Sequence, residues 1–312
     1  MKPADVRPVV VGVLDVAIDW LYAGPMVQIS RYRCLAAGRA TGREQRQPAH
    51  VIGFPHHGVF ALHQGRERLT VEQGTVLFFN NGAPYRTSHP CGGGDHGAAI
   101  AVRPDVLVEA LARFDPTVRD RPAAPFRTAL GATSSRTYLL QRLLHLRVSR
   151  RRGPHSLELE EAALALVADV AAAACRWEGS APSLRPLKER HHGAVHSVRA
   201  LLASRLGEPV SLEEVGKAVG VSPFHLCRVF RAVTGTTISR YRHTLRLRAA
   251  LERVASPDAD LSAVAMDYGY SSHSHFTAAF RREFGMTPTQ FRRASVQNRR
   301  NVAGLRAPRA GS

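Results

Sequence analysis

The sequence is poor in the features that mark disulfide scaffolds, structural zinc sites and membrane proteins. Its four cysteines, Cys34, Cys91, Cys175 and Cys227, show no C-x-x-C or other short metal-ligand spacing, which predicts reduced thiols rather than a disulfide framework. An apolar run over 9–26 is interrupted by two aspartates, so it is typical of neither a membrane span nor a signal peptide. We therefore expect a cytoplasmic protein that does not bind membranes.

Acidic residues are also scarce. The chain of 312 residues has 25 aspartates and glutamates against 43 lysines and arginines, a net charge of +18. Over 191–312 there are 18 basic and 8 acidic residues, so the C-terminal part is the more densely charged. Such an excess more often marks a polyanionic partner, nucleic acid before membrane, than a merely solvated surface. The length suits two domains, each with its own core.

The N-terminal half predicts a β-rich domain followed by helices. Between 50 and 102, short alternating segments are separated by turn signals at Gly58, Gly65, Gly74 and Asn81-Gly82, which indicates a small antiparallel β-domain. Helical periodicity follows over three segments, 105–114, 134–150 and 157–177. We assign 1–178 to this domain and the Gly/Ser/Pro-rich stretch within 179–190 to a linker.

An internal repeat with an offset of 50 residues occupies 191–294. Three residues of the first copy, Leu226, Phe230 and Gly235, correspond to Phe276, Phe280 and Gly285 of the second. Each copy has a short helix, a glycine turn, a capping serine and a second helix, which is the helix-turn-helix pattern. One such match arises easily by chance, whereas two at a fixed offset do not.

In the first copy, Ser211 and Glu214 have the spacing of a capping box, Gly220 provides the turn, and Ser222 begins the second helix. The apolar positions of that helix fall at i, i+3, i+4 and i+7 and form one inward stripe, namely Leu226, Val229, Phe230 and Val233. The residues off this stripe are Phe224, His225, Cys227, Arg228 and Arg231.

The second copy follows the same plan, with Gly269 at the turn and Ser271 or Ser272 as the cap. Its inward residues are Phe276, Ala279, Phe280 and Phe284, and its outward residues are His273, Ser274, Thr277, Ala278 and Arg281. His273 and His275 are two positions apart and do not share a helix face, so they are poorly placed to chelate one metal. At a helix N-terminus they are typical of groups that contact DNA or phosphate.

A helix over about 237–254 is predicted to join the two copies. At 1.5 Å per residue it spans about 27 Å, close to the ~34 Å between successive major-groove openings on one face of DNA. Arginines recur around it, and we expect Arg240 and Arg246 among them to contact backbone phosphate. The remaining segment, 295–312, is basic, poor in apolar residues and predicted to be disordered.

The motifs of 191–294 resemble those of the AraC/XylS family of bacterial transcription regulators. The segments that carry the resemblance are S-L-E-E-V-G-K-A-V-G-V-S-P-F-H-L-C-R-V-F, Y-R-H-T-L-R-L-R-A-A-L and Y-G-Y-S-S-H-S-H-F-T-A-A-F-R-R-E-F-G-M-T-P-T-Q-F-R. The closing G-x-T-P-x-x-F-R pattern, over 285–292, is highly specific to that family. The resemblance covers a third of the chain. It implies an all-α DNA-binding domain of two helix-turn-helix units joined by a long helix.

The resemblance also implies roles for single residues. Phe224, Cys227 and Arg228 would read bases, with His225 and Arg231 near phosphate. In the second helix the matching positions are Ser274, Thr277 and Ala278, with His273 nearby. Family members often carry a longer side chain where Ala278 stands, and this departure favours shape reading over base reading by the second helix.

For the N-terminal half, the resemblance implies a cupin-like β-barrel with helices that dimerise, and hence an α+β protein. Enzymatic cupins bind a metal through an H-x-H strand and a later histidine. Here His56 and His57 are adjacent, and a strand sends them to opposite faces, while Asn80 and Tyr85 replace the proline and the later histidine of the family pattern. We therefore predict no metal, no cofactor and no enzyme activity. The polar, turn-rich segment 85–95 suits either a ligand mouth or a surface loop.

The sequence thus predicts a DNA-binding transcription regulator whose partner is double-stranded DNA. The apolar positions of 157–177 suit either a homodimer interface or packing on the chain's own β-domain. A small-molecule effector and, for an activator, RNA polymerase complete the expected partners. The alternatives are a cupin-type metalloenzyme fused to a DNA-binding module and a nonspecific nucleic-acid binder that relies on charge.

Overall fold

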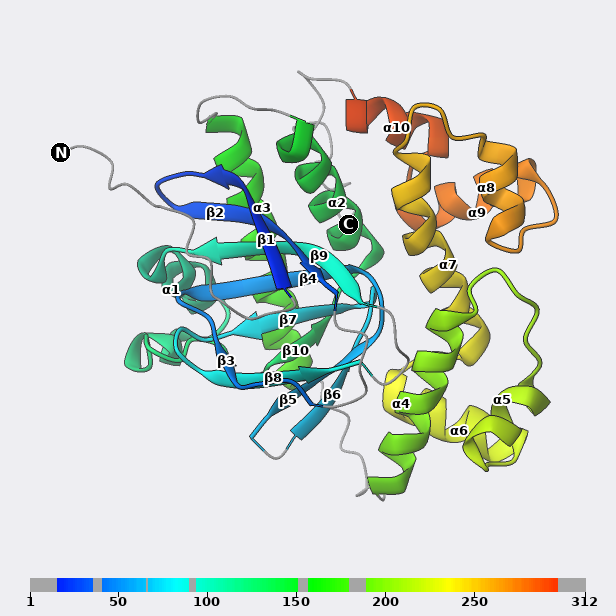
Figure 1. Ribbon diagram of the computed structural model, residues 1–312. Helices are drawn as coiled ribbons and strands as arrows, with labels where there is room; N and C mark the ends of the chain where they lie inside the picture. The colour runs from blue at the N-terminus through cyan, green and yellow to red at the C-terminus, as the bar shows by residue number, and fades with distance from the viewer. Residues whose placement is uncertain are drawn as a thin grey trace, which may run out of the picture.

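The structure is a computed structural model that describes residues 16–35, 41–65, 67–89, 94–150, 157–179 and 189–296. Two antiparallel sheets and their helices form the N-terminal part, and a run of helices forms the C-terminal part (Figure 1). This arrangement confirms the predicted α+β class. Most of the proposed linker and of the basic tail, 180–188 and 297–312, lies outside the described residues, so both remain predictions.

The larger sheet has six strands in the order β1-β2-β9-β4-β7-β10, and each neighbouring pair is antiparallel. Their bounds are β1 Val16–Ala23, β2 Val27–Cys34, β4 His50–His57, β7 Thr75–Phe79, β9 Asp95–Val102 and β10 Leu130–Ala132. The smaller sheet, in the order β3-β8-β5-β6, has β3 Gln45–Arg46, β8 Pro84–Ser88, β5 Phe60–Gln64 and β6 Glu67–Val71.

Three of these strands, β1 to β3, precede the region in which the sequence predicts strands. Edge strand β1 is mostly exposed, with only Tyr22 buried among its residues, so it lacks a clean apolar alternation. Strand β3 has two residues and no pattern to detect. Strands β4 to β9 lie within 50–102, where the sequence places them, whereas β10 at Leu130–Ala132 lies beyond that region and is not predicted.

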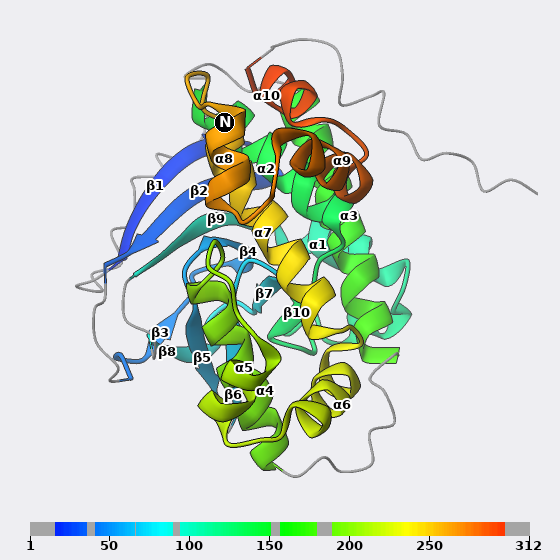
Figure 2. The same cartoon turned by 90° about the vertical axis from the view of Figure 1, so that its right-hand side faces the viewer.

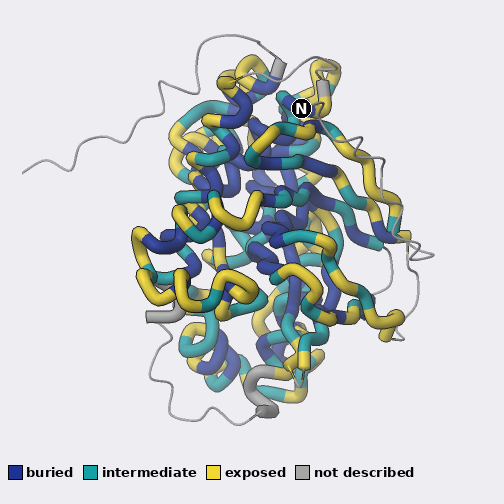
Figure 3. The backbone as a smooth tube through the Cα atoms, turned by 90° about the vertical axis from the view of Figure 1, so that its left-hand side faces the viewer, coloured by how far each residue is buried: buried dark blue, intermediate teal, exposed yellow. Residues whose placement is uncertain are grey.

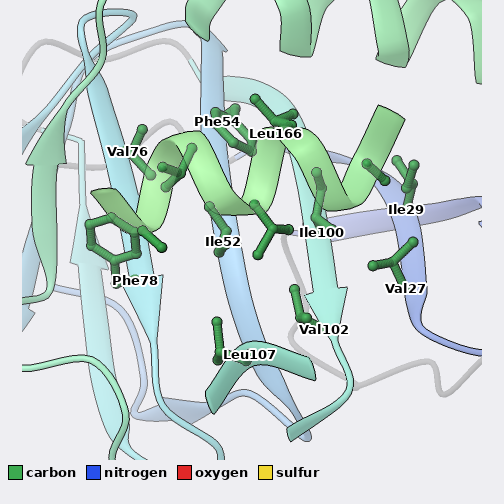
Figure 4. Close-up of a cluster of buried hydrophobic side chains, with 14 of the residues drawn as sticks. Val27, Ile29, Ile52, Phe54, Val76, Phe78, Ile100, Val102, Leu107 and Leu166 are labelled. Atoms are coloured by element: carbon green, nitrogen blue, oxygen red, sulfur yellow. The ribbon is translucent and has the colours of Figure 1, made fainter. Parts of the chain in front are cut away.

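Both faces of the larger sheet are buried. Alternate residues of each strand point to opposite sides, so each face packs against a different layer. One face packs against α1 (Pro104–Ala112), α2 (Ser135–Arg150) and α3 (Leu157–Gly179), with a short 3-10 helix at Pro116–Asp120 nearby. Figure 4 shows this cluster, in which Ile52, Phe54 and Ile100 of the sheet lie under Leu166 of α3. The other face carries Val51, Leu77 and Phe79, which pack against the smaller sheet.

Helix α3 answers one question that the sequence left open. The stripe of apolar residues on this helix, including Leu159, Ala163, Leu166 and Val170, is buried against the chain's own sheet and α1. The backbone tube in Figure 3 shows how buried residues run through the interior of the N-terminal part. Packing on its own β-domain therefore accounts for these four residues, and the homodimer stays a prediction.

The C-terminal part contains seven described helices. They are α4 Glu189–Ser204, α5 Leu212–Val219, α6 Pro223–Thr234, α7 Ile238–Val254, α8 Leu261–Asp267, α9 His273–Phe284 and α10 Pro288–Val296. We call α4 to α6 the first module and α8 to α10 the second module, with α7 between them and packed against both. In Figure 2, α6 and α9 lie toward the right of α7, and α5 and α8 lie toward its left.

The two parts of the chain share a core. Tyr138, Leu139 and Leu143 of α2, in the N-terminal part, belong to the same buried cluster as Phe280 and Phe291 of the second module. The sequence predicts two domains joined by a linker, and nothing in local periodicity reveals this contact. Within the described ranges, no helix combines the length and the apolar character that crossing a membrane requires.

Candidate nucleic-acid interface

Local signals in the sequence fix the geometry of the first module. The Ser211 hydroxyl accepts from the Glu214 amide at 3.1 Å, and the Glu214 carboxylate accepts from the Ser211 amide at 2.7 Å, which completes the predicted capping box. Gly220 has a φ of 68°, in the left-handed region that the turn requires. Ser222 caps α6, and Gly235 ends it with a φ of 73°. The predicted helix-turn-helix boundaries are therefore confirmed.

Helix α6 buries one stripe and exposes the other. Leu226, Val229 and Phe230 are buried against the residues of α4 and α5. Phe224, by contrast, has 82% of its surface exposed. Cys227, Arg228 and Arg231 are exposed beside it, and His225 is half-buried. The Arg228 guanidinium lies 3.0 Å from Nδ1 of His225, one turn earlier on the same helix.

The second module repeats this geometry. Ser272, one of the two candidate caps, accepts from the His275 amide at 3.1 Å, and Gly269 forms the turn with a φ of 74°. The inward residues Phe276, Ala279 and Phe280 are fully buried. An open groove follows the outer face of α9, and its lining residues are His273, Ser274, Thr277, Ala278, Arg281, Arg282 and Thr287. All the outward residues predicted from the sequence lie in this groove.

The arginines of α7 differ in how far they are exposed to solvent. Arg240 is half exposed and its guanidinium lies 2.7 Å from the Glu283 carboxylate of α9. Arg246 is half-buried and donates through Nε to the carbonyl of Leu206 at 2.6 Å. Both arginines therefore have partners within the protein. Their predicted contacts with DNA phosphate stay predictions. Arg248 is buried at 5% exposure and contacts the N-terminal part.

Arg248 belongs to a set of buried polar contacts between the two parts of the chain. Its guanidinium donates to the carbonyl of Thr133 at 2.8 Å and stacks 4.9 Å over the ring of Tyr138. Nearby, the carboxylate of Glu72, 1% exposed, accepts from Arg199 at 2.7 Å and from the hydroxyl of Tyr241. Burial raises the pKa of Glu72, and the charge of Arg199 opposes that rise.

A second buried group joins α2 to α7. Arg142 is 1% exposed and its guanidinium lies 2.5 Å from the carboxylate of Glu252. Nδ1 of His56 accepts a hydrogen bond from Arg142, and its Nε2 donates to Oε1 of Gln141 at 2.9 Å. Burial, reinforced by the charge of Arg142, lowers the pKa of His56. The same causes lower the pKa of His145 to about 3, so both histidines are neutral. Because these contacts join residues far apart in sequence, no local sequence pattern predicts them.

The two modules thus define a double helix-turn-helix protein with two exposed recognition faces. The helix-turn-helix domain family matches residues 215–294. The regulatory protein SoxS of Salmonella typhimurium is 31% identical over 102 residues, which cover 33% of this chain and 95% of SoxS. The chain belongs to the AraC/XylS family of transcription regulators, which are not enzymes.

Another curated relative and two solved structures are also similar to this chain. The transcriptional regulator Rob of Salmonella typhimurium is 34% identical over 119 residues, so the chain spans 39% of Rob and the match covers 37% of this chain. Among solved structures, an AraC-type regulator from Chromobacterium violaceum covers 34% of this chain and 95% of that chain, with 28% identity and a TM-score of 0.33. ToxT from Vibrio cholerae covers 86% of this chain and 98% of that chain, with 11% identity and a TM-score of 0.35.

Proposed function

We propose that the protein regulates transcription by binding a specific duplex sequence, with α6 and α9 in successive major grooves. The observation that supports this most is the 82% exposure of Phe224 beside Arg228. Interior packing does not need these side chains, because Leu226 and Phe230 supply the inward stripe. The matching face of α9 lies on the same side of α7 (Figure 2). Helix α7 has 17 residues and spans about 25 Å at 1.5 Å per residue.

In this proposal Arg228 is the main base reader. Its planar guanidinium can donate two hydrogen bonds to O6 and N7 of a guanine, and Phe224 and Cys227 can contact thymine methyl groups. The contact with His225 holds the guanidinium near the N-terminal end of the helix. His225 and Arg231 flank this face and suit backbone phosphate.

The second module would position the duplex more than it reads bases. Ser274 and Ala278 are short, so few atoms on this face reach base edges. Its charged and polar residues His273, Thr277 and Arg281 suit phosphate oxygens, and Arg240 and Arg246 add positive charge from α7. We therefore expect its contribution to specificity to come through DNA shape.

The test starts with selection of bound duplexes from random DNA by the full chain, which yields the operator. Arg228→Ala should weaken operator binding by about 1–3 kcal/mol and relax one base position. Arg231→Ala should weaken binding to all sequences alike and reduce the salt slope by about one. Arg253→Ala, at an exposed arginine beyond these faces, is the matched control. An unchanged base preference in Arg228→Ala would reject Arg228 as a base reader, and equal affinity for all duplexes would favour the nonspecific alternative.

The N-terminal part completes the proposal. We propose that its two sheets form a cupin-like barrel that senses a small molecule, and that the protein acts as a homodimer in the cytoplasm. An activator of this kind would also contact RNA polymerase. Sedimentation of the full chain, free and on operator DNA, tests the dimer, and half-site spacing in the selected duplexes gives an independent measure.

A further inference from the structure

We propose that Cys34, His89 and Asp95 form a binding site for one divalent transition-metal ion of the zinc class. One ligand atom from each side chain, a sulfur, an imidazole nitrogen and a carboxylate oxygen, lies within 4.8 Å of the other two. The three residues are 7%, 2% and 5% exposed. This inference goes beyond the proposed function, since none of these residues belongs to the DNA-binding helices.

The sheet brings the three residues together although they are far apart in sequence. Cys34 ends β2 and Asp95 begins β9, and the antiparallel register pairs them directly. His89 follows β8 and its ring nitrogen lies 2.6 Å from the Asp95 carboxylate. A side chain at Gly94 would place its Cβ 1.8 Å from the carbonyl oxygen of Cys34, so only glycine lets the chain pass here.

A neighbouring hydroxyl points to a ligand at this position. Tyr32 precedes Cys34 by two residues on β2, so both side chains lie on the same face of the sheet. The Tyr32 hydroxyl oxygen is buried and has no hydrogen-bond partner among the described residues. Buried polar groups are rarely left unpaired, and a metal-bound water would supply the missing partner.

The donor set selects the class of metal. A thiolate, an imidazole and a carboxylate together suit zinc and related transition metals, whereas magnesium and calcium prefer oxygen ligands alone. Around tetrahedral zinc, ligand atoms stand about 3.3–3.6 Å apart. The His89–Asp95 contact at 2.6 Å would therefore open by less than about 1 Å as the ion enters. Three protein ligands leave a fourth position for water or for an exogenous ligand.

The proposed site does not use the adjacent histidines His56 and His57, which stand where an enzymatic cupin has its metal ligands. His57 is exposed, and its ring stacks on that of His96 at 5.3 Å. His56 is buried against α2 through Gln141. Neither is among the three ligands. The proposed site is built from a cysteine and an aspartate that no short spacing connects, which is why a search for H-x-H or C-x-x-C does not find it.

The experiment uses the full-length protein stripped with a strong chelator and titrated with zinc against a competing chromophoric chelator. We expect one zinc ion per chain. Cys34→Ser, His89→Gln and Asp95→Asn should each weaken binding by at least about tenfold. Cys227→Ser, at an exposed cysteine on α6, is the matched thiol control and should bind zinc as the unmodified chain does.

Cobalt substitution gives a spectroscopic readout of the thiolate ligand itself. Cobalt bound to the unmodified chain and to Cys227→Ser should show a cysteinate-to-metal charge-transfer band, and that band should be absent in Cys34→Ser. Circular dichroism confirms that each variant remains folded. Absence of stoichiometric zinc, absence of the thiolate band in the unmodified chain, or binding that is lost in His273→Ala but kept in Cys34→Ser would overturn the site.

Discussion

Replacement of Leu139 with alanine tests whether the second module shares a core with the N-terminal part. Leu139 lies on α2, is 2% exposed and belongs to the cluster that contains Leu251, Phe280 and Phe291. Loss of three buried carbons removes about 2.4 kcal/mol of transfer free energy at ~0.8 kcal/mol each. The cavity left in a packed cluster raises the cost, so we expect about 3 kcal/mol of destabilisation, within the 2–5 kcal/mol range for such changes.

The assay is urea unfolding of the full chain, together with amide hydrogen exchange in α8 and α9. The unfolding midpoint should fall in Leu139→Ala, and protection should drop in the second module even though the change lies in α2. Leu157→Ala is the matched control, because Leu157 is 80% exposed and its removal should cost less than about 0.5 kcal/mol. A loss below about 1 kcal/mol in Leu139→Ala, or unchanged exchange in α8 and α9, would refute the shared core.

Three further predictions concern stability. The pKa of His145, lowered to about 3 by burial, lies below the ~6.5 of the unfolded chain, so stability should fall as pH drops from 6.5 toward 3, by about 2 kcal/mol at pH 5. Because His56 also has a lowered pKa and contributes to the loss in acid, His145→Gln should show a smaller slope, and an equal slope in both proteins would contradict the assignment. Ser272→Ala should cost about 1 kcal/mol by removing the cap of α9, whereas Ser271→Ala should change thermal stability little. Gly220→Ala should lower the free energy of unfolding by about 1 kcal/mol because its φ is 68°, whereas Gly193→Ala within α4 should raise it. A change of the same sign in both variants, measured by chemical unfolding, would disprove the turn argument.

The sequence predicts most of the DNA-binding part because the signals there are local. A cap such as Ser211, a turn glycine such as Gly220 and a stripe at helical spacing each act within one or two turns of chain. The exposed face of α6 follows from the same periodicity, since Phe224 and Arg228 fall off the inward stripe. Boundaries and burial in both modules are therefore confirmed with little adjustment.

The contacts that the sequence does not predict all depend on long-range packing. Arg248 has the spacing of a surface arginine on α7, and only the position of α2 and β10 shows that it is buried. The Cys34–His89–Asp95 cluster requires the register of β2 with β9, which no local pattern contains. The two modules also look equivalent in sequence, although only the second packs its core against Leu139.

The two modules contact the N-terminal part through different kinds of interaction. This difference determines how much free energy it costs to separate each module from that part. The second module shares an apolar core with α2, so separating them exposes hydrophobic surface to water at about 25 cal/mol per Å². The apolar cluster of the first module, as far as the chain is described, contains only residues of 195–245. Its cross-domain contacts are polar and centre on Glu72, one of whose oxygens has no partner within the described ranges. Separation there returns Glu72 and Arg199 to water and recovers part of their desolvation cost. The first module, which carries Arg228, is therefore the one whose position relative to the N-terminal part costs less to change.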